Sequence, residues 1–516
     1  MIYLILKGKA FIFMFREKIQ LFANNRFACQ MKTCRVKSFS LLKLFNGYGN
    51  RNSAENLPGK FVLFLLGLIL AGLMGCAPKT QTVSVPVDTT EVFSGSGNQE
   101  TPEKWWIEFN NEKLNLLVDS AITSNFSLKS AWQRLQASRA VVDRESSSFW
   151  PTLESSAQGE SSKYQTQYVQ NQSFQLGLRS SYEVDMWGKI RSRVEAERYR
   201  AKASLNDYQT AALSLSAEIV RTWYQLIEAQ NQVSVVNEQI KTNEEMLKLI
   251  EARFGSGQIR SADILRQRRL LESTREQRIT AQTRVGELEH KLAVLLGNPP
   301  QEEVNQLQDS LPELPPVPET GVPAELIRRR PDVQSVYNRL QAADREVAAA
   351  ISSQYPRFSI SASASTSANS VDDLFKDWAR SLSGNLLAPL FYGGRLRAEV
   401  DRSEAIKKQR LYEYGQTILN AFREVEDALM LEEKQREKIQ SIRKQVDISR
   451  QTYEQLRVQY FNGFGGYLDV LTALDELQQL RRNLLSAHLQ LLEYRVALYR
   501  SLAGGFETAR ESNNEQ

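Results

Sequence analysis

The sequence predicts an α+β fold that is built twice, with long antiparallel helical hairpins and four strands. Residues 188–254 contain no proline, and their apolar side chains recur at spacings of three and four, as in a helix that packs lengthwise on other helices. At a rise of 1.5 Å per residue, such a helix extends about 100 Å. The segment GKIRSRVE at 188–195 returns 206 positions later as GRLRAEVD at 394–401. The chain therefore contains an internal duplication.

The N-terminal part carries most of the positive charge. The 516 residues have a formal net charge of +5, but residues 1–75 hold 11 Lys and Arg against 2 Asp and Glu. The remaining residues therefore carry a net charge of −4, spread along the predicted helices. This distribution argues against nucleic acid as a partner.

A lipoprotein signal precedes Cys76. The apolar run at 61–72 is too short to span a bilayer, and it leads into LMGC at 73–76. This ending resembles the bacterial lipobox, which implies cleavage before Cys76 and attachment of lipid, including palmitate, to that residue. Cys29 and Cys34 lie upstream and would be removed, so the mature chain has no disulfide. An ordinary signal peptide with a chance cysteine is the alternative.

The first 59 residues are longer than the charged segment expected before the apolar run of a lipoprotein precursor. We expect translation to start downstream of Met1, near Leu57. Ala77, directly after the cysteine, is not the aspartate associated with retention in the inner membrane. An outer-membrane destination is therefore allowed.

The duplication divides the chain into six parts. Each repeat is predicted to hold short helices, two strands and a long helical hairpin that turns at glycines. The parts are an N-terminal extension with the signal peptide (1–75), a lipid-anchored linker (76–103), the first repeat (104–298), a Pro-rich connector (299–323), the second repeat (324–505) and a polar C-terminal tail (506–516).

Four segments alternate between apolar and polar residues and are predicted strands: 153–163, 173–183, 358–368 and 382–390. Four strands cannot close a barrel, and an open edge in lipid leaves backbone groups unsatisfied. Eight strands from a dimer would be filled by side chains, whereas twelve from a trimer leave an open lumen. Closure of a transmembrane β-barrel therefore has to come from other copies of the chain, with the long antiparallel coiled-coil helices continuing from the strands. A soluble sheet with one solvated face is the alternative.

Several motifs occur in a fixed order along the chain. They are WW at 105–106, LIRRRPDVQSVYNRLQAADREVAAA from 326, YPRF at 355–358, PLFYGGR at 389–395 and GYLDVL at 466–471. On these motifs the chain resembles the TolC/OprM-type outer-membrane efflux proteins, in particular their lipoprotein branch. The resemblance covers roughly residues 105–505. Thr472 departs from it, because some members have a second acidic residue there.

The resemblance implies a homotrimer with a twelve-stranded barrel in the outer membrane of a Gram-negative bacterium. A long helical tunnel would extend through the periplasm, with the helices around the connector forming a belt. The implied partners are a periplasmic adaptor, an inner-membrane pump and outer-membrane lipid. The implied function is that of an exit duct for small molecules or drugs.

No catalytic, cofactor-binding or metal-binding constellation is visible in the sequence. His290 and His488 are isolated, and no P-loop, no GxGxxG after a strand and no CxxC occurs. We expect a protein that is not an enzyme, needs no cofactor and conducts passively with energy supplied by a partner.

The candidate gate lies at the turns of the two hairpins. Helix ends gathered around a threefold axis would place each turn residue in a ring, and carboxylates in a ring attract cations and repel each other. Asp469 matches the tip aspartate of the family, Asp263 is its counterpart in the other copy, and Tyr467 is expected to pack beside it. The alternative for either aspartate is a helix N-cap.

Two further groups have alternative interpretations. The arginines at 328–330 either form a solvated helix end or meet acidic partners or lipid head groups. Trp187, Phe391 and Tyr392 lie where strand becomes helix, which suits the periplasmic membrane interface or simple packing.

Two other functions compete with small-molecule efflux. The same channel could serve as a type I protein-secretion outlet, and coiled coils alone could form a non-conducting periplasmic scaffold lipoprotein. The alternating strands argue against the scaffold. The sequence does not disclose the exported substrate, because substrate selection normally lies with the pump.

Overall fold

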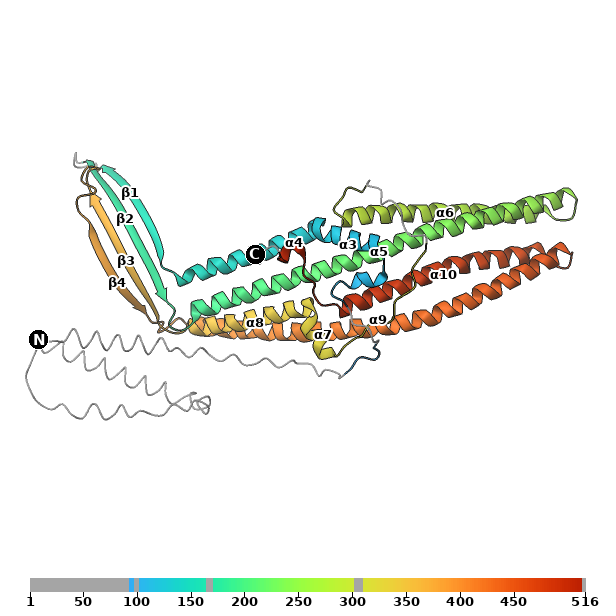
Figure 1. Ribbon diagram of the computed structural model, residues 1–516. Helices are drawn as coiled ribbons and strands as arrows, with labels where there is room; N and C mark the ends of the chain where they lie inside the picture. Colours follow the sequence, from blue (N-terminus) through green and yellow to red (C-terminus); the bar gives the residue numbers. More distant parts are fainter. Residues whose placement is uncertain (1–91, 97–101, 164–169, 301–309, 513–516) are drawn as a thin grey trace, which may run out of the picture. The chain divides into compact units, whose positions relative to one another are not determined.

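The computed structural model describes residues 92–96, 102–163, 170–300 and 310–512 (Figure 1). All of these belong to one structural unit, Gly72–Gln516. The lipobox with Cys76, the proposed start near Leu57 and most of the linker lie outside the described residues, so the expectations for them stay predictions.

The duplication is visible in the helices and strands themselves. The two long helices α5 and α9 have 67 residues each and begin 206 positions apart, and the return helices α6 and α10 begin with the same offset. Strands β1 and β3 have 12 residues each and are offset by 205. The bounds are Lys189–Gly255 for α5, Ser261–Leu295 for α6, Arg395–Phe461 for α9, Tyr467–Leu502 for α10, Thr152–Lys163 for β1 and Arg357–Ala368 for β3.

Short helices precede each pair of strands. Asn111 and Asn125 accept hydrogen bonds from the N–H groups of Leu114 and Leu128, both at 3.0 Å, and so cap the helices that follow them. Proline occupies the first position of α7 and of α8, where its missing N–H costs nothing. The bounds are Trp105–Phe109 for η2, Glu112–Ser124 for α3, Phe126–Ser146 for α4, Ser147–Phe149 for η3, Pro323–Arg329 for α7, Pro331–Ser352 for α8 and Ala509–Ser512 for α11.

The four strands form one antiparallel sheet in the order β1-β2-β3-β4, with β2 at Gln170–Val184 and β4 at Ala379–Leu387 (Figure 1). Paired residues project to the same side of a sheet. Ile360 lies opposite Tyr182 and Gly384, and Ser361 lies opposite Ser181 and Ser383. The register therefore collects most of the apolar side chains on one face and most of the polar ones on the other, with Ser180 and Arg380 on the apolar face and Leu387 on the polar face as exceptions.

The two faces differ in what they offer to solvent. On the apolar face Leu153, Leu382 and Leu386 are exposed over 74%, 79% and 66% of their surface. On the polar face the hydroxyl groups of Ser361 and Ser383 are 2.9 Å apart. A sheet that leaves large aliphatic side chains uncovered needs an apolar environment on that side.

The fourth strand begins and ends three residues earlier than the sequence predicted. It covers residues 379–387 instead of 382–390. Pro389 has no N–H to donate to a ladder and also restricts the residue before it, so the strand ends before it reaches the proline.

Glycines with positive φ mark the same places in both copies. Gly188 (φ 74°) and Gly394 (φ 85°) precede the two long helices, and Gly257 (φ 75°) and Gly463 (φ 83°) lie in the two hairpin turns. The left-handed region is costly for residues with a Cβ atom. Both copies therefore depend on glycine to enter the long helix and to leave it.

The C-terminal residues are part of the core, although the sequence suggested a polar tail at 506–516. Phe506 is buried and meets the Trp106 ring edge to face at 5.1 Å. Trp105 stacks on Tyr499 at 5.7 Å, and Thr508 shares a hydrogen bond of 2.9 Å with the hydroxyl of Tyr208. The tail prediction was wrong for Phe506 and Thr508, because the phenylalanine finds an apolar site among aromatic side chains near the N-terminus of the first repeat.

A buried arginine on α10 holds both a glutamate of α9 and the Pro-rich connector. Arg495 of α10 and Glu432 of α9 form two hydrogen bonds, at 2.8 and 2.6 Å, and both side chains are almost completely buried. Nη1 of Arg495 also donates to the carbonyl oxygens of Pro315 (2.6 Å) and Pro316 (2.9 Å). Burial alone would raise the pKa of Glu432, but the hydrogen bonds and charges of Arg495 and Arg436 outweigh it and lower that pKa.

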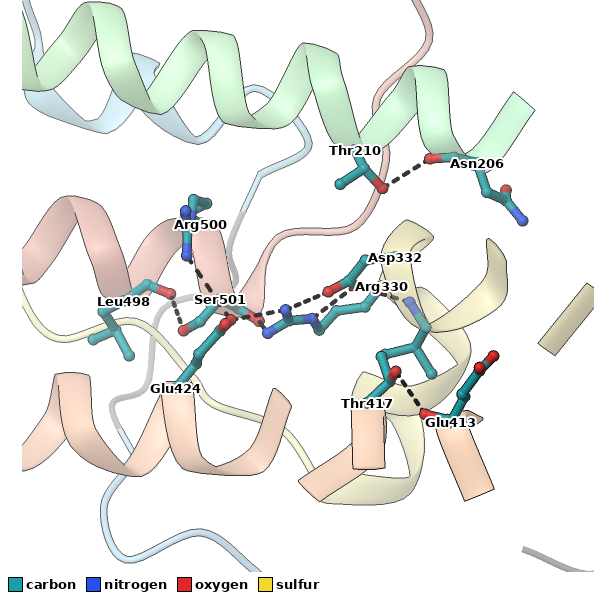
Figure 2. A network of polar contacts seen from close by, with 11 residues as sticks. Asn206, Thr210, Arg330, Asp332, Glu413, Thr417, Glu424, Leu498, Arg500 and Ser501 are labelled. Atoms are coloured by element: carbon teal, nitrogen blue, oxygen red, sulfur yellow. Dashed lines mark hydrogen bonds and ion pairs between the residues drawn. The ribbon is translucent and has the colours of Figure 1, made fainter. Parts of the chain in front are cut away.

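The arginine cluster at 328–330 is divided: Arg328 and Arg329 are exposed at the helix end, whereas Arg330 is buried. Figure 2 shows Arg330 between Asp332 and Glu424, with distances of 2.7 and 2.8 Å from its Nη2 atom. Arg330 is only 7% exposed, and Arg329 donates to the carbonyl oxygen of Leu502. The solvated interpretation was wrong for Arg330, because its carboxylate partner on α9 is 94 residues away in the sequence.

We predict that Glu432→Gln lowers the free energy of unfolding by about 3 kcal/mol, because it leaves Arg495 buried without its counter-charge. Since the folded-state pKa of Glu432 is lowered, its contribution is present above its ordinary value of 4.5 and is lost as the pH falls through the lowered pKa. The free energy of unfolding, measured by guanidinium denaturation at a series of pH values, should therefore fall more steeply from pH 7 to pH 3 for the parent than for the variant. Glu399→Gln, at an exposed ion pair with Arg402, is the control and should leave unfolding unchanged. The same dependence of the unfolding free energy on pH in the parent and in Glu432→Gln would contradict a stabilising role for the ionised Glu432.

Candidate channel gate at the hairpin turns

The turns of the two hairpins share one apolar core. Buried side chains from all four long helices belong to a single cluster, with Ile250 from α5, Leu270 from α6, Tyr453 from α9 and Leu474 from α10. The two turns, one from each copy, are therefore held together as one tip (Figure 1). A change in one turn must be accommodated by the other, because packed interiors tolerate little displacement.

Asp263 and Asp469 occupy the third position of their helices. The N-caps of these helices are Arg260 and Gly466, so the N-cap alternative is wrong for both aspartates. A carboxylate in the first turn still interacts favourably with the positive end of the helix.

The two aspartates differ in their surroundings. Asp263 is mostly covered and pairs with Arg266 at 3.3 Å. Asp469 is exposed, and its carboxylate has no ion pair or hydrogen bond in the part of the chain that the structure describes. No contact joins the two aspartates there. Of the two aspartates, Asp469 is thus the exposed one without a partner in the described chain.

Tyr467 lies inside the tip and does not extend from it. Its side chain is buried, its ring packs against Tyr460 at 5.4 Å, and its hydroxyl donates to Oε1 of Gln267 at 2.5 Å. Burial, aided by the neighbouring Tyr460, Tyr453 and Asp263, raises the pKa of Tyr467, so the phenol remains neutral. The sequence placed Tyr467 beside Asp469, and that packing stays a prediction; of the two aspartates, Asp263 is the one that contributes to the raised pKa of Tyr467.

Arg253 joins the two hairpins and was not singled out from the sequence. Its guanidinium, on the last turn of α5, donates to the carbonyl oxygens of Tyr460 (3.3 Å) and Phe461 (2.9 Å) at the end of α9. The same group lies over both rings, at 5.1 and 5.0 Å. A cation at the end of a helix satisfies carbonyl groups that have no partner within the helix.

Buried polar side chains form a hydrogen-bonded network next to the tip. Asn243 of α5 donates to Thr274 of α6 (2.9 Å), and Gln478 of α10 donates to Asn243 (3.1 Å). Gln267 donates to the backbone carbonyl of Asn243 (2.8 Å). All four side chains are buried, so each hydrogen bond has to be made within the protein. No periodicity signals such partners, because they lie up to 235 residues apart in the sequence.

The junction of strand and helix uses the aromatic residues in different ways. Trp187 donates to the carbonyl oxygen of Pro356 at 2.6 Å and stacks on Tyr355 at 5.0 Å, so it packs within the junction. Phe391 is 89% exposed and Tyr392 is partly exposed. Trp187 thus packs in the junction and is also 45% exposed, so both interpretations stay open for it, while Phe391 is available to an interface.

The described residues contain no group of histidine, cysteine and acidic side chains that could hold a metal ion. His290 is exposed, and His488 lies 3.0 Å from Arg443. Partial burial, followed by the charge of Arg443, lowers the pKa of His488. Among the helices that the structure describes, none has both the length and the apolar character needed to cross a bilayer.

The family model for outer membrane efflux proteins matches residues 117–298 and 322–504, one segment in each copy. The chain belongs to this family. It is accordingly an efflux protein of the Gram-negative outer membrane, and the predicted architecture of helical tunnel and β-barrel is confirmed by the solved structures that it resembles.

Among the relatives of this efflux protein is the pyoverdine export outer membrane protein OpmQ of Pseudomonas aeruginosa, 28% identical over 462 residues, which are 86% of this chain and 96% of OpmQ. The cation efflux system protein CusC of Escherichia coli is 25% identical, over 87% of this chain and all of CusC. The solved structure of the outer-membrane channel OprN superimposes with a TM-score of 0.74 at 27% identity, and covers 84% of this chain and 99% of its own.

We predict that Arg253→Gln shifts the tip toward open states. The change removes the charge over Tyr460 and Phe461 and weakens two hydrogen bonds. A net loss of about 1.4 kcal/mol, typical of one hydrogen bond, corresponds to about a tenfold shift in the equilibrium. Single-channel recording in planar bilayers should show the variant open more often. Arg268→Gln, at an exposed ion pair with Glu251 on the same hairpin, is the matched control. Identical open times for parent and Arg253→Gln would show that this contact does not restrain the tip.

Proposed function

We propose that three copies of this chain form the exit duct of a tripartite efflux system. The observation that carries the proposal is the two-faced sheet, whose outer edges lack strand partners among the described residues and whose strands lead directly into the duplicated long helices. Three copies supply twelve strands, enough to close a barrel around an open lumen. The polar face then lines the lumen and the apolar face contacts lipid.

The duct conducts passively, and the proposal contains no chemical step. A periplasmic adaptor and an inner-membrane pump supply the driving force and select the cargo. Small molecules or ions are supported as the cargo class by the related proteins, which include a pyoverdine export protein, a toluene efflux pump protein and a cation efflux system protein. Lipid on Cys76 anchors the chain at the periplasmic side of the outer membrane.

The tip formed by the two hairpins is the proposed gate. Three copies of Asp469 would form a ring of carboxylates at the periplasmic end, since each one is exposed and unpaired in its own described chain. Asp263 is a weaker candidate, because Arg266 already compensates its charge. Tyr467 supports the tip from inside through Gln267.

We predict that Asp469→Asn reduces cation preference in planar bilayers. Removing three negative charges from a narrow ring lowers the local cation concentration, and we expect the ratio of cation to anion permeability to fall on the order of twofold at 0.1 M salt and less at 1 M. Asp447→Asn, at an exposed pair with Arg450 further along α9, is the control. If the parent protein forms no pores, the proposed exit-duct function is contradicted. A conducting parent with an unchanged variant contradicts only the role of Asp469.

A further inference from the structure

A cavity with charged walls lies where the sheet meets the long helices. It has a volume of about 220 Å³ and is formed by the ends of β2, β3 and β4 and by the first turns of α5 and α9. Six charged side chains line it: Glu183, Asp185, Lys189, Arg193, Arg357 and Arg395. Four of them are cationic and two are acidic, which leaves a surplus of two positive charges in each chain.

The strand register places this cavity on the polar face of the sheet. Arg357 is the first residue of β3 and alternates in step with Ser359 and Ser361, and Glu183 lies directly opposite Ser359. Alternate residues of a strand, and residues paired across two strands, project to the same side of a sheet. The cavity therefore belongs to the side of the serines, which is the side that lines the lumen of the proposed duct.

The acidic side chains in this cavity are already engaged. Glu183 pairs with Lys189 at 3.2 Å. Asp185 accepts hydrogen bonds from the backbone N–H groups of Ile190 (3.0 Å) and Arg191 (2.8 Å) at the start of α5. One carboxylate is thus matched by the lysine and the other by the positive end of a helix. The surplus charge resides on the three arginines.

The three arginines present their charge to solvent. Arg193, Arg357 and Arg395 are all exposed, and none of them forms an ion pair within the residues that the structure describes. Arg395 lies over the ring of Tyr392 at 5.1 Å, a contact that orients the guanidinium group without neutralising it. Water screens these charges, but no carboxylate of the described chain cancels them.

The duplication shows where part of the surplus comes from. Lys189 and Arg395 are counterparts at the offset of 206, and each is the first residue of its long helix. In the first copy the lysine is neutralised by Glu183, whereas the position of Glu183 in the second copy is taken by Pro389. The second copy therefore has the cation at the start of the helix without the carboxylate.

Few other charges lie on the same face of the sheet. Apart from Arg357, this face of β3 and β4 carries only serine, asparagine, alanine and leucine. On β1 and β2, Glu154 lies opposite Arg179, and Glu160 lies opposite an uncharged serine. The junction of sheet and helices is thus the level at which positive charge accumulates, below a wall lined mostly by hydroxyl groups.

We propose that three copies of this cavity form a positively charged ring in the lumen, which concentrates anions where the barrel meets the tunnel and favours the passage of anionic solutes over cationic ones. The inference rests on the proposed trimeric duct and does not depend on the gate. A ring of fixed charge attracts ions of opposite sign within roughly a Debye length, about 10 Å at 0.1 M salt and about 3 Å at 1 M. The preference for anions at this level therefore weakens as the salt concentration rises.

The test measures reversal potentials of the full-length protein in planar bilayers under a gradient of potassium chloride. The parent is compared with Arg193→Gln/Arg357→Gln/Arg395→Gln, and both proteins also carry Asp469→Asn, which removes the charge of the proposed gate. We expect the ratio of anion to cation permeability to fall on the order of twofold in the triple variant at 0.1 M salt and to change little at 1 M. Equal ratios in the two proteins at 0.1 M salt would overturn the proposal.

Restoring the charge chemically separates its effect from a structural effect of the substitutions. No cysteine occurs after residue 76, so Arg357→Cys can be modified selectively with membrane-impermeant methanethiosulfonate reagents. A reagent that adds a trimethylammonium group should return the permeability ratio toward the parent value, and one that adds a sulfonate should lower the ratio further. Ala362→Cys, on the opposite face of the same strand, is the matched control and should respond to neither reagent.

The outcomes distinguish the ring from the duct. Conducting pores in which neither reagent changes the permeability ratio of Arg357→Cys, or in which Ala362→Cys responds equally, would overturn the ring and leave the exit duct intact. A parent that forms no pores would overturn the exit duct, and the ring with it.

Discussion

Backbone hydrogen bonding at the sheet edges is the constraint on which the rest of this structure depends. Within the described chain, β1 and β4 are each paired on one side only. In a bilayer, each unsatisfied N–H or C=O group costs several kcal/mol. One chain therefore cannot place this sheet in lipid alone, and identical chains are the simplest source of the missing partners. The proposed trimer meets this requirement, and the helical tunnel continues the barrel because each strand pair leads into a long helix.

Comparison of the two copies shows where they have diverged: the residues that join the two hairpin turns differ between them. Arg253 corresponds to Gln459 at the offset of 206, and Tyr467 corresponds to Ser261. The contacts that join the two turns are thus made once, by Arg253 from the first copy and Tyr467 from the second. The long helices keep the same length in both copies, while the tip has become asymmetric.

The sequence predicted the features that depend on local pattern. Helical spacing and turn glycines place the first long helix within one residue of its observed ends, and alternation gives the two faces of the sheet. The features that it missed depend on partners far away in the chain. Arg330 appeared to be a solvated arginine because its partner Glu424 is 94 residues away in the sequence. Phe506 appeared to belong to a polar tail because its partner Trp106 is 400 residues upstream. The candidate gate was predicted in part. Its aspartates follow recognisable turns, but no local sequence pattern indicates the hydrogen bonds of Arg253 to the end of α9 or those of the buried amides Asn243 and Gln478.

The central claim, that one face of the sheet contacts water and the other contacts lipid, can be measured directly. No cysteine occurs after residue 76, so single cysteines can be introduced along β3 without further changes to the strand. In proteoliposomes, a membrane-impermeant maleimide should label Ser361→Cys and Ser363→Cys and leave Ile360→Cys and Ala362→Cys unlabelled. Equal labelling of all four positions, or labelling of the apolar pair alone, would contradict the account.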